Sequence, residues 1–503
     1  MTRFGIARAD EFGATVGSGT PRGEVLVVFS STVFLFLFLP VVLALYFSVR
    51  PGLQNGVLLV ASAIYYAWDE STVARVVLYS IVANYLFGLA IQRLQSAFWR
   101  RVLLGHAVVT NIGLLLWYKY ANFAVSSANT LLALLHSKHA PIVLTPVVLP
   151  LGISFFTFHA LSYVIDIYRR QAVAQKSLPL ICLYILFFPQ LIAGPIVRYH
   201  ELADQLRRRK VSAAGLSAGI ERFVLGLAKK MLIANTAAEV SDTVFTLPAA
   251  DLNSPLAWLG VGAYALQVYF DFSGYSDMAI GLARMFGFEF PENFDYPYIA
   301  RSMTEFWRRW HLSLSRWFRD YLYVPLGGNR RGPLRTYLNL ATVFLLCGLW
   351  HGASWNFVIW GALHGAFLVL ERLGFQRLLE RVWSPVRHVY TLLVVLVTWV
   401  FFRAPTLSAA SSFLHAMFGG AHSASHVHRA LDFLDHERAL AFSLGIIGST
   451  PILKWIERHL PQRSFGQLAL LELGKLAAIV SLAVASAVKL SAGTYNPFIY
   501  FRF

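Results

Sequence analysis

Two histidines in the stretch from 301 to 364 have the chemical type that proton transfer requires. His311 directly follows Trp310 among arginines and aromatic residues, and His351 directly follows Trp350 near the end of an apolar run. An ionisable side chain at membrane depth costs several kcal/mol unless it is paired or used. A neutral imidazole can accept a proton from a hydroxyl near pH 7. We therefore interpret His351 as a candidate general base; the alternative is a hydrogen-bonded residue of the helix packing.

The apolar run around His351 predicts a membrane segment over 338–370, with glycines that permit close helix packing. Helical spacing predicts three neighbours on the face of His351, namely Cys347, Ser354 and Trp355. Cys347, one turn before His351, is the only candidate for a covalent intermediate. His364 is interpreted as a packing or end-of-helix residue.

Residues 301–321 predict one amphipathic helix that lies along the membrane surface. At about 100° per residue, its arginines fall on one side, its aromatic residues on the other, and His311 on the border. Such a helix is typical of an interfacial anchor. Alternatively, the arginines also attract a phosphate-bearing donor, and His311 lines the path of that donor. The candidate donor-binding arginines are Arg308, Arg309, Arg316 and Arg319.

Asn329 is a further donor-binding candidate, because it ends the sequence Pro-Leu-Gly-Gly-Asn at 325–329. Two glycines and an asparagine tolerate positive φ and predict a tight turn. Such a turn can form a backbone nest for an anion. A plain turn is the simpler interpretation.

The elements that position these residues are predicted to be membrane helices. The chain is 57% hydrophobic and only 14% charged, whereas soluble domains carry about 25% charged residues. Apolar runs separated by short basic clusters predict an all-α, polytopic integral membrane protein. We expect about 11–13 membrane segments, some of them re-entrant. Three prolines in 141–168 predict a broken segment before a helix.

Charge and domain organisation support the same class. The net charge of +17 is spread over short loops, which favours contact with anionic membrane lipid rather than nucleic acid. We expect residues 1–24 to be disordered or extended and residues 25–503 to form a single membrane domain. Asp271 and Asp277 are expected to pair with arginines of 301–319. No disulfide framework or metal site is expected from Cys182 and Cys347.

Several long motifs resemble one family. The sequences FWRRWHLSLSRWFRDYLYVPLGGNR and GLWHGASWNFVIWGALHG, with LPLGISFFTFHALSYVIDIYR, FFPQLIAGPIVRY and FDFSGYSDMAIGLARMFG before them, are similar to the membrane-bound O-acyltransferase (MBOAT) superfamily. The bacterial branch typified by the membrane subunit of alginate O-acetyltransferase is the most similar. The resemblance covers about residues 27–503. It implies a helical fold around a central tunnel, with His351 as the essential histidine and His311 as its partner.

The resemblance also implies a function. Acetyl would pass from a cytoplasmic donor, acetyl-CoA, to an extracytoplasmic acetyltransferase or glycan acceptor, in the bacterial inner membrane and in alginate acetylation. The same chemistry on cellulose, peptidoglycan or teichoic acid is the alternative within the family. A transporter or an export-complex scaffold without acyl transfer is the alternative of another class.

Overall fold

The computed structural model describes residues 28–68, 74–136, 140–420, 429–459, 465–493, 495 and 497. These residues form helices and turns, and the described part contains no strand. The all-α prediction is therefore confirmed. The expected disordered or extended segment 1–24 lies outside the described residues. A hydrophobic cluster extends from Phe29 to Met417; the assignment of 25–503 to a single domain stays a prediction.

The helices are short and numerous. The first group consists of α1 (Leu39–Ser48), α2 (Gln54–Ala67), α3 (Ala74–Arg93), α4 (Ala97–Leu115), α5 (Ala121–Leu134), α6 (Ile153–Tyr168), α7 (Leu178–Leu186), α8 (Phe188–Leu191) and α9 (Tyr199–Arg207). The second consists of α10 (Ala213–Ala228), α11 (Asn235–Thr246), α12 (Ser254–Met285), α13 (Met303–Trp307), α14 (Leu312–Phe318), α15 (Pro333–His351), α16 (Trp355–Leu370) and α17 (Gln376–Arg381). The third consists of α18 (Ser384–Arg403), α19 (Leu407–Met417), α20 (His436–Gly448), α21 (Ile452–His459) and α22 (Phe465–Ser491).

Wider π-helical turns interrupt or extend several of these helices. They span Phe34–Phe38, Leu116–Tyr120, Lys229–Ala234, Arg319–Tyr323 and Glu371–Phe375. Such turns are rare and are frequently found at functional sites. The turn at Leu116–Tyr120 joins α4 to α5 and carries two of the side chains that hold the candidate site.

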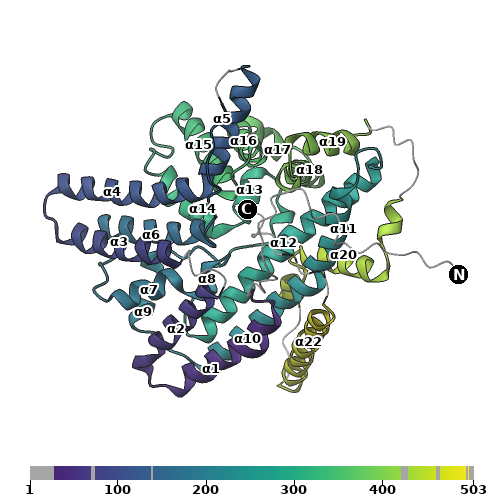
Figure 1. Ribbon diagram of the computed structural model, residues 1–503. Coiled ribbons are helices and arrows are strands. Elements are labelled where there is room, and N and C mark those ends of the chain that lie inside the picture. Colours follow the sequence, from purple (N-terminus) through teal and green to yellow (C-terminus); the bar gives the residue numbers. More distant parts are fainter. Residues whose placement is uncertain are drawn as a thin grey trace.

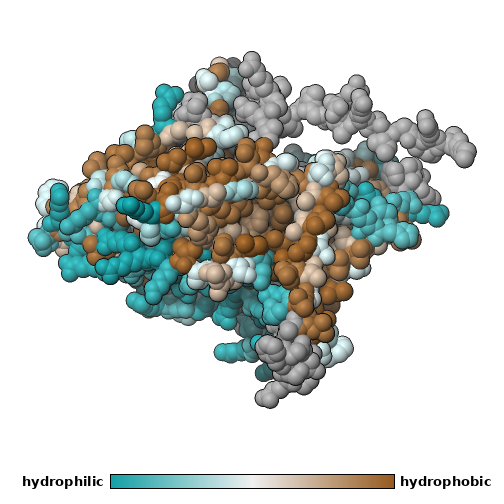
Figure 2. Space-filling model, turned by 90° about the horizontal axis from the view of Figure 1, so that it is seen from below, coloured by the Kyte–Doolittle hydropathy of each residue, from teal (hydrophilic) through white to brown (hydrophobic). Residues whose placement is uncertain are grey.

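Five helices in the described residues are long and apolar enough to cross a membrane. They are Ala74–Arg93, Ala97–Leu134, Trp355–Arg381, Ser384–Arg403 and Leu470–Ser491. This number is below the predicted 11–13 because several predicted spans are divided: the run at 338–370 forms two helices, and the run at 141–168 is irregular before α6. Figure 2 shows apolar side chains over much of one face, with hydrophilic side chains at its borders.

The long helix α12 crosses the middle of the molecule and packs against α10 and α11 (Figure 1). A Cβ on Gly226 would lie 2.5 Å from the carbonyl oxygen of Gly274, so the backbones of α10 and α12 are in contact. This packing corrects the predicted pairing of the two acids. Asp277 pairs with Arg222 and Lys229 at 2.7 and 2.6 Å.

Asp271 of α12 likewise pairs within this part of the molecule, 2.7 Å from the ammonium of Lys230. Both side chains are almost fully buried. Basic residues of α10 and of the turn after it, not the arginines of 301–319, therefore form the ion pairs with Asp271 and Asp277. That contact depends on how α10 and α12 cross, which no local pattern specifies.

Candidate active site

His311 lies in a break between two helices, so the predicted continuous helix over 301–321 is wrong. Helix α13 ends at Trp307, α14 begins at Leu312, and His311 has φ 45° and ψ 56°. Few residues other than glycine adopt this left-handed conformation, and strained residues of this kind cluster at active sites. The His311 side chain is fully buried. It lies inside the protein and not on the border of a surface helix.

Asn293 holds this break in place. Its side-chain oxygen lies 3.2 Å from Nδ1 of His311 and accepts hydrogen bonds from the backbone and hydroxyl of Ser313 at 3.2 and 2.9 Å. Its carbonyl accepts from the backbone N–H of Leu312 at 2.9 Å. Nε2 of His311 has no hydrogen-bond partner among the described residues. One ring nitrogen of His311 is therefore oriented by the protein and the other is left for a further group.

His351 is the last residue of α15, and Gly352 ends the helix with an extended backbone. The predicted single segment over 338–370 is therefore two helices. Trp355 begins α16 and is 54% exposed, so the predicted shared face with His351 is wrong for that residue. Cys347 lies one turn before His351 and is buried.

The two helices that meet at this break pack backbone to backbone. A Cβ on Gly361 would lie 2.3 Å from the carbonyl oxygen of Phe344, and one on Gly348 would lie 2.2 Å from that of Phe357. This confirms the close approach expected from the glycines. The same close packing of α15 against α16 fixes the position of the end of α15, and with it the position of His351.

The last turn of α15 has every carbonyl satisfied, chiefly by two neighbouring residues of another helix. The final four carbonyls of a helix have no partner within it. Gly352 N–H donates to the carbonyl of Gly348 at 3.3 Å, and Tyr120 Oη donates to that of Leu349 at 2.6 Å. These bonds leave the carbonyls of residues 350 and 351.

Lys119 donates hydrogen bonds to both remaining carbonyls. Its Nζ donates to the carbonyl of Trp350 at 2.5 Å and lies 3.5 Å from that of His351. A third contact, at 3.2 Å, joins it to Oγ of Ser154. A cation at a helix C-terminus also interacts favourably with the helix dipole. Lys119 and Tyr120 therefore fix the backbone that carries His351.

Aromatic rings surround the His351 imidazole. Its ring centroid lies 4.9 Å from that of Trp350, 5.1 Å from Trp360 and 5.2 Å from Phe402. The His311 ring contacts the same Trp350 at 6.1 Å. Neither ring nitrogen of His351 has a hydrogen-bond partner among the described residues. The two predicted histidines thus contact one tryptophan, and the His351 nitrogens are not used by the packing.

A third histidine belongs to the same cluster of rings. His364 lies within α16, not at its end, and its ring is 4.6 Å from Trp360. Its Nδ1 accepts a hydrogen bond from Nε1 of Trp307 at 3.2 Å. The packing interpretation of His364 therefore fits its contacts, and the end-of-helix interpretation does not.

A small cavity adjoins His351. Its volume is about 50 Å³, and its wall includes Lys119, Ser154, Trp350 and the irregular stretch from 149 to 152. A water molecule needs about 10–15 Å³ of such volume, so the cavity has room for about three to five waters or a small polar group. His351 is thus part of the wall of a space that can hold a hydroxyl, although its ring nitrogens are themselves buried.

A second, larger cavity, which we call the arginine cavity, is lined by three of the five predicted donor-binding residues. Its volume is about 280 Å³, and Arg308, Arg319 and Asn329 line it together with Arg372. The rest of its wall is mostly apolar and comprises Trp307, Leu314, Phe318, Leu340, Val343, Phe344, Cys347 and Leu368, beside Thr304, Ser315 and Tyr323. A cluster of guanidinium groups beside an apolar surface suits a ligand with phosphates and an uncharged arm.

Two predicted arginines lie outside this cavity. Arg309 pairs with Glu305 at 2.9 Å and with Asp295 at 3.2 Å. Arg316 is partly buried on α14 and is not part of the lining. The arginine cavity nevertheless comes close to His351, because Cys347 in its wall precedes His351 by four residues, about 6 Å along the helix.

Sequence reasoning missed three residues of the site. Lys119 is a lysine within the apolar helix Ala97–Leu134, and a charge at that depth was a usable signal. Arg372 follows an apolar helix at its end, where a basic residue is ordinary. Asn293 lies in an irregular stretch and gave no signal. Within the described residues, no three His, Cys, Asp or Glu side chains are grouped as metal ligands would be.

Comparison with known proteins defines the class. Residues 65–409 match the model of the MBOAT, membrane-bound O-acyltransferase, family. The chain belongs to this family and is an acyltransferase of the membrane.

Individual relatives agree with this assignment. The chain is 42% identical over 493 residues to the probable alginate O-acetylase AlgI of Pseudomonas putida, covering 95% of this chain and 100% of the relative. It is 46% identical to the protein of the same description from Pseudomonas aeruginosa, over 80% of this chain and 77% of the relative. It is 35% identical to the peptidoglycan O-acetyltransferase of Helicobacter pylori, over 78% and 80%.

Proposed function

We propose that this protein transfers acetyl groups from acetyl-CoA to hydroxyl groups of alginate, directly or through an extracytoplasmic partner protein, in the bacterial inner membrane. The observation that carries the proposal is the setting of His351. Its ring nitrogens have no hydrogen-bond partner among the described residues, and His351 lines a small, mostly apolar cavity about 6 Å along α15 from the arginine cavity. Relatives described as alginate O-acetylases, at 42–46% identity, support alginate as the polymer.

The arginine cavity is the proposed donor site. Arg308, Arg319 and Arg372 would bind the phosphates of acetyl-CoA, and the apolar wall would receive the uncharged arm that ends in the thioester. Because Cys347 belongs to that wall, the thioester carbonyl would reach α15 close to His351. Arg309 is excluded from this role because it lies outside the cavity, where it pairs with Glu305. Arg319 lines the cavity and also pairs with Asp320 at 2.7 Å, so a phosphate would have to share it with that acid.

His351 is the proposed general base. It would take the proton of the acceptor hydroxyl while the hydroxyl oxygen attacks the thioester carbonyl. The carbon–sulfur bond then breaks, and the protonated imidazole returns the proton to the departing CoA thiolate. His311 would assist through Trp350, which contacts both rings. Direct transfer is favoured over an acyl-Cys347, because among the described residues the Cys347 thiol donates no hydrogen bond to a base.

Peptidoglycan is the second candidate acceptor, because the Helicobacter pylori relative is described as acting on it. A test that separates the acceptors uses purified protein in proteoliposomes, labelled acetyl-CoA and either alginate or peptidoglycan fragments. We expect label in alginate ester. If only the peptidoglycan fragments are labelled, peptidoglycan and not alginate is the acceptor. If neither is labelled, even with the extracytoplasmic partner supplied, the proposal is contradicted.

Substitution of Arg372 by alanine should raise KM for acetyl-CoA about tenfold, because one phosphate contact worth about 1.4 kcal/mol is lost. The kcat should change less than threefold, since the contact is made equally in the ground state and the transition state. Initial rates over a range of acetyl-CoA concentrations measure both. Arg316→Ala is the matched control, because Arg316 lies outside the cavity. An unchanged KM in Arg372→Ala would remove this cavity from consideration as the donor site.

A further inference from the structure

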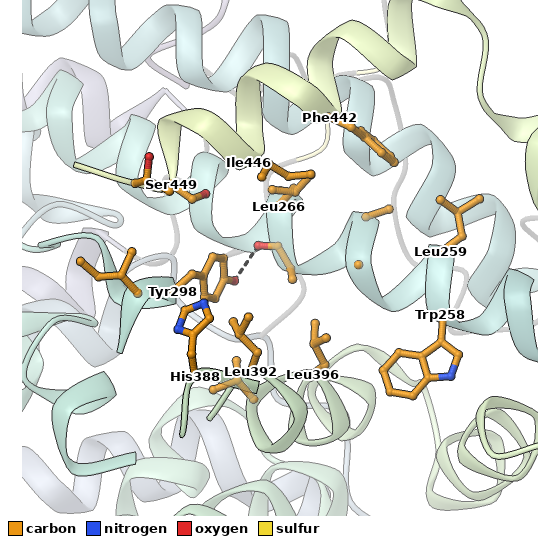
Figure 3. Close-up of a pocket in the computed structure, with 16 residues that line it drawn as sticks. Trp258, Leu259, Leu266, Tyr298, His388, Leu392, Leu396, Phe442, Ile446 and Ser449 are labelled. Carbon is orange, nitrogen blue, oxygen red and sulfur yellow. Dashed lines mark hydrogen bonds between the residues drawn. The ribbon is translucent and has the colours of Figure 1, made fainter. Parts of the chain in front are cut away.

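An elongated, partly open apolar cavity lies apart from His311, from His351 and from the arginine cavity. Its volume is about 370 Å³, and it is lined by α12, α18, α20 and the turn at Pro297–Ile299 (Figure 3). The residues in its wall are different from those of the other two cavities. The acyl-transfer mechanism makes no use of it.

The cavity extends for about half the thickness of a bilayer. Three helices line it: α12 over 258–266, α18 over 388–396 and α20 over 442–446, with Ser449 and Thr450 just after α20. At 1.5 Å per residue, the stretches of α12 and α18 are each about 12 Å long. Helix α18 is a candidate membrane span of 20 residues, about 30 Å, the thickness of the hydrocarbon core. The cavity therefore extends from near the first turn of α18 to about its middle, which is the depth of one leaflet.

The two ends of the cavity differ chemically. Trp258, Leu396 and Phe442 lie at one end, and Tyr298, His388 and Ser449 lie at the other (Figure 3). The Tyr298 hydroxyl donates to the carbonyl of Ala265 at 2.6 Å, and His388 Nδ1 is 3.2 Å from the carbonyl of Ala300. These bonds fix the polar end in place. The apolar end lies deeper along α18.

Basic residues flank the polar end. Arg387 directly precedes His388, Arg301 follows Ile299 by two residues, and Lys454 follows Thr450 by four. Arg301 and Lys454 are exposed. The buried Nε of Arg387 has no hydrogen-bond partner among the described residues. These three residues are not part of the cavity wall, but each lies within four positions of a residue that is, so cationic groups lie next to this end.

Two carboxylates lie near this end. Asp295 lies 3.7 Å from Nζ of Lys454 and 3.2 Å from Arg309, and Arg309 also pairs with Glu305 at 2.9 Å. Arg309 is therefore balanced by these acids, and Lys454 keeps only the longer contact with Asp295. The ring of Tyr296 also lies 4.9 Å from the Lys454 ammonium.

We propose that this cavity binds one anionic glycerophospholipid, with an acyl chain along α12, α18 and α20 and the phosphate at Arg387 and Lys454. The apolar wall and one-leaflet depth fit an acyl chain, and the basic end fits an anionic headgroup. The bound lipid would hold α20 against α18. This site is separate from the proposed acyl transfer, so each can be tested without the other.

Gly262 makes a sharp test possible. It lines the cavity, and a Cβ built on it meets no atom within 4 Å. The backbone at this position therefore accepts a side chain, and Gly262→Phe should place its ring in the cavity where the acyl chain would lie; it also removes a residue that disfavours helix. Gly105→Phe is the matched control, because Gly105 also has open space around it and lies on α4.

Native mass spectrometry of the full chain, titrated with phosphatidylglycerol or phosphatidylcholine, measures how many lipids of each kind stay bound. We expect the native protein and Gly105→Phe to retain one phosphatidylglycerol with at least tenfold preference over phosphatidylcholine. Gly262→Phe should lose this bound lipid, and Arg387→Glu combined with Lys454→Glu should abolish the preference. Retention of the lipid by Gly262→Phe, with its helical content unchanged by circular dichroism, would overturn the proposal. Equal binding of both lipids by the native protein would do the same.

Discussion

Replacement of His351 by glutamine is expected to lower kcat by about 10²–10⁴-fold, the usual contribution of a positioned general base. Glutamine keeps a polar group of similar length but cannot accept a proton at neutral pH. KM for acetyl-CoA should change little, because the arginine cavity is untouched. Acetyl transfer by the purified variant measures the first effect, and initial rates at varied donor concentration measure the second.

His364→Asn is the matched control for this experiment. His364 belongs to the same aromatic cluster and is also buried. Asparagine can preserve an acceptor for Nε1 of Trp307. We expect activity within about threefold of native for this variant. If His351→Gln retained a third or more of native kcat, the assignment of His351 as the base would be wrong. Cells with His351→Gln should still secrete polymer, but without its acetyl ester.

Loss of the Lys119 ammonium should lower both activity and stability. Lys119→Met leaves two carbonyls at the end of α15 without a donor, which costs about 1–3 kcal/mol for each buried polar group. The backbone of His351 is then less well held, and a displacement of about 1 Å costs about 10²-fold in kcat. We expect a kcat loss of that order, with partial recovery in Lys119→Arg. Arg101→Met, an exposed change on the same helix, should leave kcat unaltered.

Amide hydrogen exchange separates positioning from a general loss of fold. In Lys119→Met, the peptide covering 346–356 should exchange faster, while peptides from α12 should be unchanged. Tyr120→Phe removes the single bond to Leu349 and should produce a smaller change in the same peptide. Full kcat together with native exchange in Lys119→Met would show that this cap does not position His351.

The long apolar helices were predictable because their length alone identifies them. The apolar runs of the sequence at 386–402 and 467–489 correspond to α18 and α22 within a few residues. The irregular stretch before α6 was predictable from its prolines. These features depend on local sequence alone, so they could be predicted without knowledge of the fold.

The breaks beside both histidines were not predictable from the pattern of residues. The stretch from 301 to 321 has helical periodicity throughout, and its break at His311 depends on Asn293, about twenty residues earlier. The end of α15 had one local signal, since Ser354 before Trp355 is a typical first residue of a helix. The roles of the individual arginines were not predictable either. Arg309 forms ion pairs with Glu305 and Asp295, whereas Arg372, from a later part of the chain, lines the arginine cavity.

The wide turn at Leu116–Tyr120 has a consequence for how this chain can vary in length. A π-helical turn contains one residue more than an α-helical turn. Removal of one residue there would restore a regular α-helical turn, which keeps α5 in nearly the same orientation but changes which side chains of the turn face α15. The ammonium and the phenol would then no longer face the end of α15 together. We therefore expect this short stretch to tolerate substitutions but not deletions, an unusual constraint for the interior of a transmembrane helix.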